Sequence, residues 1–297
     1  MPEFRKVLLE DKKWVDPLYK INQFRSCEFS FANVFLWSEQ SNVTIANIDG
    51  FFVAKSGDSH TFSFPIGEGN PKPVIEKLMK YAEEKGDVFK LRGLCESAPQ
   101  MLEEMFPGKF EFSTNRDYSD YIYSAESLAT LVGKKLSAKR NHINNFLRDY
   151  PNWRFEPITA DNLQECYELT LKWCELNHCS EDTAKQKEFK AVRLALENLE
   201  ALALDGGIIR VDGEVIAFSI GEPLTDDTYV VHIEKTFSDI QGAYPIINRE
   251  FVRHYAKDFT YVNREEDLGI PGLRKAKLSY RPVIILDKYD AVLKNQE

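Results

Sequence analysis

GIIRVDGEVIAFSIG, residues 207–221, decides the fold, because two apolar runs flank the pair Asp212-Gly213. Asp-Gly between alternating apolar runs is the strongest short signal for a β-hairpin, since both central residues of a type I′ turn need positive φ. The apolar stretch TYVVHIEK (228–235) follows after a short polar connection. The sequence therefore predicts a three-strand antiparallel meander.

The same order of elements occurs twice. Residues 43–113 repeat it around a second turn at Asp49-Gly50, and in each half the meander is followed by helix, strand, helix and strand. This is the element order of the acetyltransferase-like (GNAT) fold. We therefore predict an α/β protein of the α+β type, with two tandem GNAT-like domains, each a mixed, mostly antiparallel sheet flanked by helices. In the second half the predicted elements are a helix over 244–255, the strand FTYVN (259–263), a helix that begins near Pro271 and the strand VIIL (283–286).

The length of 297 residues agrees with two domains. We place the boundary near residue 130, which gives an N-terminal domain over 1–130 and a C-terminal domain over 131–297 that is expected to hold the active site. No apolar run approaches the ~20 residues that span a bilayer. The start, MPEFRKVLLEDKKW, lacks the apolar core of a signal peptide. We expect a cytoplasmic protein without a membrane span.

Charge and cysteine content restrict the function classes. A net charge of −9 argues against a general nucleic-acid coat protein. The five cysteines are scattered without a CxxC pair, which predicts free thiols in a reducing compartment. A zinc site at Cys174, His178 and Cys179 is the less favoured alternative, because Cys166 would have to complete it at an unusual spacing. We expect no metal.

One stretch is locally basic despite the acidic total. GKKLSAKRNHINNFLR, residues 133–148, contains Lys139 and Arg140 and no acidic residue. A helix over this stretch would place its apolar residues on one face and its basic residues on another. The basic face is either a solvated helix surface or a site for phosphate groups. The sequence leaves both interpretations open.

Polar residues at two strand ends are candidates for chemistry. On a strand over 229–235, His232 and Glu234 share a face and Lys235 lies on the other. Burying a charge is costly unless it is paired or solvated, so these residues mark either a cleft or a rim salt bridge. Asn263 ends the next predicted strand and is well placed to meet a ligand.

Three sequence blocks resemble a known family. They are Lys139-Arg140-Asn141, His232-Ile233-Glu234-Lys235 and NREEDLGIPGLRKAK (263–277). They are similar to an uncharacterised bacterial family related to the C-terminal catalytic domain of lysylphosphatidylglycerol synthases, and nearly the whole chain is covered. Like the Fem-type aminoacyl transferases, this family is expected to be a tandem pair of GNAT-like domains.

The resemblance implies transfer of an aminoacyl or acyl group to an amine or hydroxyl of a small-molecule or peptide acceptor. The relatives take the group from aminoacyl-tRNA, whereas simple acetyltransferases take it from coenzyme A, so no separate cofactor is required. Aligning Gly242 with the pyrophosphate loop of the simple enzymes puts Asp239 and Tyr244 at unfavourable positions. An aminoacyl-tRNA donor is therefore expected rather than an acyl-coenzyme A donor.

The roles follow from this hypothesis. Glu234 is the predicted general base, and Asn263 orients the substrate. Lys139 and Arg140 would hold donor phosphates, with Gly242 in the cofactor loop. The alternative is a catalytically silent binding module, in which the same charges pair with one another. An open polar cleft at Glu234 would favour transfer, whereas full mutual pairing would favour the module. The remaining predicted substrate contacts are His232, Lys235, Glu265, Asp267 and Lys275.

Overall fold

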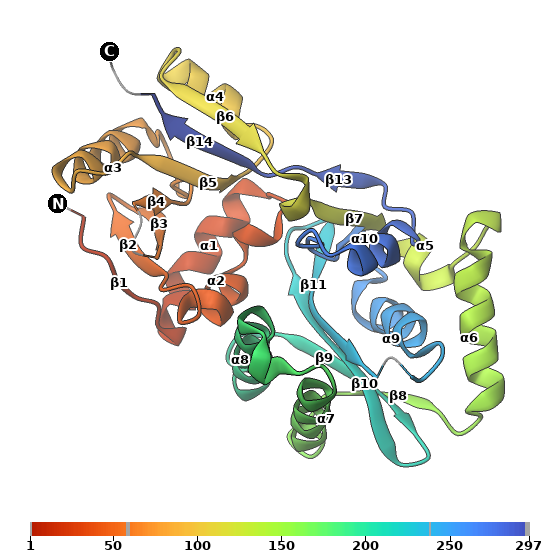
Figure 1. The fold of residues 1–297 in the computed structure, drawn as a ribbon. Helices are drawn as coiled ribbons and strands as arrows, with labels where there is room; N and C mark the ends of the chain where they lie inside the picture. The colour runs from red at the N-terminus through yellow and green to blue at the C-terminus, as the bar shows by residue number, and fades with distance from the viewer. Residues whose placement is uncertain (1, 58–59, 238, 295–297) are drawn as a thin grey trace. The chain divides into compact units, whose positions relative to one another are not determined.

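The computed structural model describes residues 2–57, 60–237 and 239–294 (Figure 1). The chain forms two compact units, Met1–Asp120 with Leu286–Glu297, and Tyr121–Ile285. This division differs from a single boundary near residue 130. The difference arises because the last strand of the chain pairs within the first unit, and the strand that begins at Asp120 pairs within the second.

The first unit contains a seven-stranded sheet of order β1-β2-β3-β4-β5-β14-β6. The strands are β1 (Arg5–Lys6), β2 (Thr44–Ile48), β3 (Phe51–Ser56), β4 (Thr61–Phe62), β5 (Lys90–Leu94), β6 (Phe110–Thr114) and β14 (Tyr289–Leu293). The helices are α1 (Lys12–Asn22), α2 (Phe31–Ser38), α3 (Lys72–Glu84) and α4 (Ala98–Met105).

The second unit contains a seven-stranded sheet of order β13-β7-β12-β11-β10-β9-β8. The strands are β7 (Asp120–Ser124), β8 (Arg154–Pro157), β9 (Asp205–Val211), β10 (Glu214–Pro223), β11 (Thr228–Thr236), β12 (Tyr261–Asn263) and β13 (Ile284–Leu286). The helices are α5 (Ala125–Thr130), α6 (Ser137–Asp149), α7 (Leu163–Leu176), α8 (Thr183–Glu197), α9 (Ala243–Phe251), which continues as a π-helical turn over Val252–Ala256, and α10 (Pro271–Leu278).

The two sheets have the same topology. Each has an antiparallel meander, β2-β3-β4 in one and β9-β10-β11 in the other. The last strand of each meander then pairs in parallel with the next strand, β4 with β5 and β11 with β12. The prediction of two tandem GNAT-like copies is confirmed.

Both predicted hairpins form at the Asp-Gly pairs. Asp49 and Gly50 have φ of 52° and 86°, and Asp212 and Gly213 have φ of 48° and 95°. Positive φ at both central residues is the type I′ requirement, and its twist matches that of the flanking strands. Each turn therefore fixes the register of its meander, as the partnership of Val211 with Glu214 shows.

The two copies exchange one strand each. β7, which follows β6 of the first sheet along the chain, pairs with β12 in the second sheet. β14, which follows β13 of the second sheet, pairs with β5 and β6 in the first. β7 and β14 occupy equivalent places, so the exchange is reciprocal.

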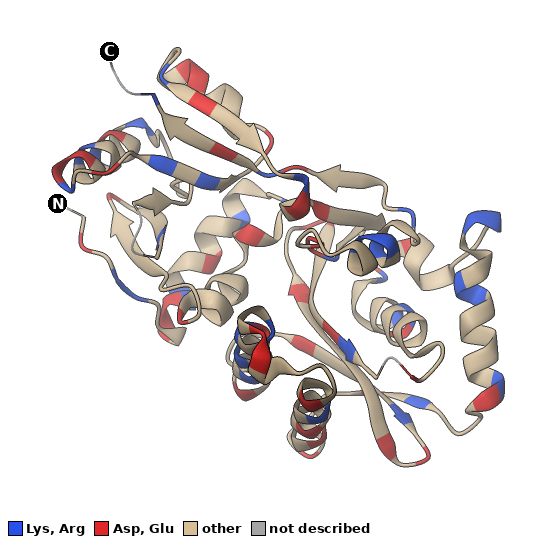
Figure 2. Cartoon of the chain, viewed as in Figure 1, with Lys and Arg blue, Asp and Glu red and all other residues tan. Residues whose placement is uncertain are grey.

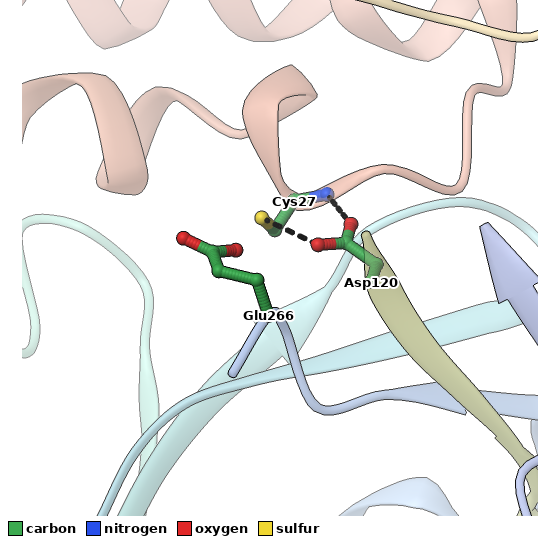
Figure 3. A group of neighbouring side chains, drawn as sticks. All are labelled: Cys27, Asp120 and Glu266. Carbon is green, nitrogen blue, oxygen red and sulfur yellow. Dashed lines mark hydrogen bonds between the residues drawn. The ribbon is translucent and has the colours of Figure 1, made fainter. Parts of the chain in front are cut away.

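Buried polar contacts hold the points where the chain crosses between the sheets. The Lys288 ammonium lies 2.9 Å from the Asp120 carboxylate, and the two side chains are 4% and 0% exposed. Ser119 Oγ donates to Asp287 at 2.7 Å. The backbone N–H of Cys27 donates to Asp120 at 2.8 Å, and its thiol also points at that carboxylate (Figure 3). Both crossings are thus tied to one ion pair.

The core of the second unit lies between its sheet and α5, α6 and α9. Phe146 of α6, Phe251 of α9 and Tyr229 of β11 are among its largest buried side chains. Gly242 precedes α9 with φ of 88°, and a Cβ there would lie 2.6 Å from the carbonyl oxygen of His142. Close packing of α6 on the start of α9 therefore requires glycine at this position.

Cys174 and Cys179 form a disulfide, so the expectation of free thiols is wrong for these two residues, and neither sulfur is available as a zinc ligand. The physical reason is their proximity, with Cα atoms 5.1 Å apart at the end of α7.

Over the described residues, every helix is too short or too polar to cross a membrane.

Replacing Lys288 with Met tests the ion pair at the crossings. The variant removes a buried cation that lies 2.9 Å from the Asp120 carboxylate, so we expect the free energy of unfolding to fall by about 3–5 kcal/mol. Urea unfolding followed by circular dichroism measures this loss. Lys294→Met is the control, because Lys294 is exposed and should change stability by less than ~0.5 kcal/mol. Equal effects of the two variants would contradict the assignment.

Candidate active site

The candidate site lies where β11 and β12 stop pairing. Their parallel ladder runs from Thr228 with Tyr261 to Val230 with Asn263 and ends there, although β11 continues to Thr236. Beyond the ladder, side chains connect the two chain segments. The first of these connections comes from Arg264, directly after β12.

Glu234 is the centre of a buried polar cluster. Arg264 Nη2 donates to one carboxylate oxygen at 2.8 Å, and Asn248 Nδ2 donates to the other at 3.1 Å. The side chains of Glu234 and Arg264 are each 12% exposed. Glu234 is therefore paired, as in the salt-bridge interpretation of the sequence, and its role as a general base stays a prediction.

Two cations share the ring of Tyr280. The Arg264 guanidinium carbon lies 4.8 Å from the ring centroid, and Lys139 Nζ lies 4.1 Å from it. Tyr123 packs against Arg264 as well, at 5.6 Å. The negative face of an aromatic ring attracts cations most strongly where water is excluded. Lys139 thus belongs to the Glu234 cluster and not to the exposed basic face of α6.

Three atoms of this cluster lack partners. Within the part of the chain that the structure describes, Asn248 Oδ1, Arg264 Nη1 and the Tyr280 hydroxyl are buried without a hydrogen-bond partner. Leaving such a group unpaired costs about 1–3 kcal/mol. Buried polar atoms are nearly always satisfied, so a group of exceptions indicates a place for a ligand or an ordered water.

The pKa values of the two cations in the cluster shift in opposite directions. Burial lowers the pKa of Lys139 and the nearby Arg264 lowers it further, whereas Glu234 opposes both. Burial also lowers the pKa of Arg264, but Glu234 and the two tyrosines outweigh it and raise the pKa overall. Burial raises the pKa of Tyr280. Arg264 therefore keeps its proton, and Lys139 is the cation that most readily loses one.

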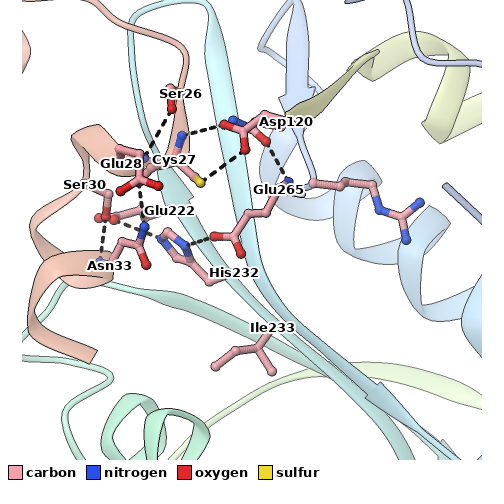
Figure 4. Close-up of polar contacts among 12 residues, drawn as sticks. Ser26, Cys27, Glu28, Ser30, Asn33, Asp120, Glu222, His232, Ile233 and Glu265 are labelled. Carbon is pink, nitrogen blue, oxygen red and sulfur yellow. Dashed lines mark hydrogen bonds and ion pairs between the residues drawn. The ribbon is translucent and has the colours of Figure 1, made fainter. Parts of the chain in front are cut away.

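His232 lies on the same face of β11 as Glu234, with a carboxylate at each ring nitrogen. Nδ1 is 2.8 Å from Glu265 and Nε2 is 3.2 Å from Glu222 (Figure 4). Burial lowers the pKa of His232, but the two carboxylates outweigh this and raise it to about 10. His232 is therefore an imidazolium at neutral pH that fixes Glu265, and with it the loop that carries Arg264, against β11.

The loop after β12 is shaped by its own polar side chains. Asn263 Oδ1 accepts from the Glu265 N–H at 2.7 Å, and Glu265 has φ of 56°. β12 ends at Asn263, the residue at which the sequence predicted the end of this strand. Asp267 accepts two bonds from Arg274, at 2.8 and 2.7 Å. Asn263 thus contacts the loop itself, whereas Asp267 also binds Arg274 of α10 and the Tyr121 hydroxyl of β7.

Other predicted site residues lie apart from Glu234. Lys235, on the opposite face of β11, lies 2.5 Å from Glu188 and 3.6 Å above the Trp173 ring. Arg140 donates to backbone carbonyls, including that of Gly133 at 2.7 Å, at the end of α5. Lys275 is exposed on α10. The structure does not bring these three side chains to the cluster.

Basic residues recur along the segment from Lys134 to Arg148 (Figure 2). Lys134 and Lys135 are exposed in the turn that precedes α6, whereas Lys139 and Arg140 are half-buried on the helix. The exposed lysines are compatible with both interpretations of the sequence, a solvated surface and a site for phosphate groups.

Sequence reasoning missed Asn248, Arg264 and Tyr280. Arg264 could have been found, because it directly follows the strand end where Asn263 was singled out. Asn248 is a buried polar residue within the apolar helix α9, which is a weaker signal. Nothing in the sequence around Tyr280 indicates that its ring supports two cations.

Fold and cluster together define a class of protein, a tandem GNAT-like protein with a polar site where the parallel strands of its second copy separate. The family model of the phosphatidylglycerol lysyltransferase C-terminal domain matches residues 19–292. The chain belongs to this family.

Individual relatives agree in fold. A conserved protein of unknown function from Bacteroides thetaiotaomicron has a TM-score of 0.94 and 42% identity, covering 99% of this chain and 100% of that one. L-PGS from Bacillus licheniformis has a TM-score of 0.66 and 14% identity, covering 97% and 93%. An uncharacterized protein of Mycoplasmoides gallisepticum is 25% identical over 182 residues, 60% of this chain and 56% of that protein. The matched region thus spans just over half of the Mycoplasmoides protein.

A double-mutant cycle tests the ion pair between Glu234 and Arg264. Glu234→Ala and Arg264→Met should each lower the free energy of unfolding by about 3–5 kcal/mol, because each leaves a buried charge unpaired. The double variant should lose less than the sum. The exposed pair of Arg193 and Glu197 is the control, with a coupling below ~1 kcal/mol. Additive losses at Glu234 and Arg264 would contradict the pairing.

The doubly paired imidazolium predicts a pH dependence of stability. The folded pKa of His232 is raised to about 10, above its ordinary value near ~6.5. Its stabilisation is therefore complete below about pH 6.5 and is lost as pH rises through about 10. His232→Gln should differ from the wild type most at pH 6 and least at pH 10 in urea unfolding. His142→Gln, at an exposed position, should show no such trend. A difference that does not change with pH would refute the charge assignment.

Proposed function

We propose that this protein transfers an aminoacyl group from aminoacyl-tRNA to an amine or hydroxyl acceptor, at the Glu234 cluster of the second unit. Membership of the phosphatidylglycerol lysyltransferase C-terminal family supports an aminoacyl transfer. The identity of the amino acid and of the acceptor are separate questions, which the experiment below begins to address.

The unpartnered atoms of the cluster are the observation that carries the proposal. Arg264 Nη1 is a donor, Asn248 Oδ1 is an acceptor and the Tyr280 hydroxyl is either. An aminoacyl ester offers a carbonyl oxygen for the donors and an α-ammonium for the acceptor. An acetyl thioester offers the carbonyl alone and would leave Asn248 Oδ1 unpaired.

In this arrangement each residue has a defined task. Arg264 and Tyr280 would stabilise the negative charge that develops on the carbonyl oxygen as the acceptor attacks. Glu234 holds both Arg264 and Asn248 through hydrogen bonds, so its contribution would be to orient these two side chains. A preorganised set of donors needs no rearrangement during the reaction.

The start of α9 supports tRNA over coenzyme A as the donor. The glycine that would cradle a pyrophosphate is Gly242, and its Cβ position lies 2.6 Å from His142 O and 2.9 Å from Phe146 Cβ. α6 therefore occupies the space beside this glycine. The exposed Lys134 and Lys135 offer charge for a nucleic-acid backbone at the other end of the same segment.

A catalytically silent binding module is the second candidate. The pairing of Glu234 with Arg264 favours it, since paired charges can be purely structural. The unpartnered atoms distinguish the two candidates, because a structural ion pair alone would not require them.

Binding of a stable donor analogue tests the proposal. In the analogue an amide replaces the ester of lysyl- or alanyl-adenosine, and the matched control compound carries an acetyl group without the α-amine. We expect the aminoacyl analogues, and not the control, to raise the melting temperature saturably, since a ligand of the folded state stabilises it by RT ln(1 + [L]/Kd). Asn248→Ala should reduce the preference for the α-amine.

The possible results separate the candidates. A saturable shift with acetyl-coenzyme A but none with the aminoacyl analogues would assign the thioester donor instead. No shift with any of these compounds would favour the silent module.

A further inference from the structure

We propose that Lys139 is the general base of the transfer, an inference that rests on the aminoacyl-transfer function proposed above. The residue lies on α6, on the inner side of the segment that the sequence assigned to phosphate binding. Its ammonium group contacts the face of Tyr280, 4.1 Å from the ring centroid.

Counted together with Lys139, the cluster holds two cations and one carboxylate. Arg264, from the loop after β12, lies against the other part of the same ring, at 4.8 Å. Glu234, from β11, is the acidic group that acts on both cations. Its carboxylate already accepts from Arg264 at 2.8 Å and from Asn248 at 3.1 Å. Lys139 is therefore the surplus cation of the cluster.

Other titratable groups do not supply the missing negative charge. Tyr280 and Tyr123, which face Arg264 from two further elements, stay neutral because burial raises the pKa of both. Lys135, in the turn before α6, and His142, on α6, are exposed and lie three to four residues from Lys139 on either side. A guanidinium cannot lose its proton in a protein, whereas a desolvated lysine beside a second cation can. Burial and Arg264 therefore lower the pKa of Lys139, while Glu234 opposes them.

A neutral amine at this place can perform the proton transfers that the reaction needs. As the acceptor nitrogen or oxygen forms a bond to the ester carbonyl carbon, Lys139 takes the proton from that atom. The bond from the carbonyl carbon to the ribose oxygen then breaks, and the Lys139 ammonium returns the proton to that oxygen. The step consumes no net proton and needs no oxidant or metal.

This assignment replaces two predictions from the sequence. Lys139 was expected to hold donor phosphates, and Glu234 was expected to be the base. Glu234 is engaged by two donors. The face of Tyr280 favours the charged form of Lys139, whereas burial and Arg264 lower its pKa.

Competitive labelling of the whole protein tests the inference without an assay of activity. Trace acetic anhydride acetylates neutral amines, and peptide mass spectrometry gives the extent at each lysine as a function of pH. We expect the labelling midpoint of Lys139 to lie at lower pH than that of Lys135. Shielding by the fold changes the rate of labelling but not its midpoint. A shared midpoint would overturn the inference.

Two variants should move this midpoint in opposite directions. Arg264→Met removes the neighbouring cation and should raise it, whereas Glu234→Gln removes the carboxylate and should lower it further. Arg140→Met is the matched control, because Arg140 is the next residue of α6 and binds backbone carbonyls of Leu131 and Gly133. Circular dichroism establishes that each variant is folded. If Arg264→Met unfolds, the Glu234→Gln result decides alone.

The aminoacyl-adenosine amide separates this inference from the proposed function. Saturating analogue should protect Lys139, and not Lys135, from acetylation. Binding without protection of Lys139 would place the reacting group elsewhere and overturn the base assignment while leaving the function intact. Absence of binding would overturn the function, and the base assignment with it, even if the midpoint of Lys139 is low.

Discussion

The structure depends on the buried ion pair between Asp120 and Lys288. Each of these residues lies where the chain leaves one sheet for the other, so a single contact holds both crossings. A buried pair of charges adds little stability by itself, because desolvation offsets most of the attraction. The contact favours the exchanged arrangement, because an arrangement that separates the two side chains loses this ion pair.

The local elements were predictable because local chemistry decides them. Asp-Gly turns set both hairpins, and alternating apolar residues set the strands that continue from them. The exchange of strands was not predictable. The sequence indicates that β6 and β7 are consecutive strands, but it does not indicate which sheet each strand joins. Contacts between residues far apart in sequence, such as that of Asp120 with Lys288, distinguish the two outcomes. The predicted domain boundary near residue 130 treats each half of the chain as a continuous domain that keeps its own strands.

The site was predictable in place but not in composition. Strand alternation correctly put His232 and Glu234 on one face of β11, and both meet side chains from the loop after β12. The chain turns at Glu265, which has positive φ, and the side chain of the preceding Arg264 reaches Glu234. Residues from four further segments complete the cluster, and their convergence is a property of the tertiary fold that a single sequence does not encode locally.

The reciprocal exchange also constrains how the protein can be made. Because β14 is translated after the whole second unit, the first sheet cannot close while the ribosome is still producing the middle of the chain. Until then β5 and β6 lack the strand that pairs with both of them. Unpaired strand edges are the parts of a sheet most prone to pair with other chains.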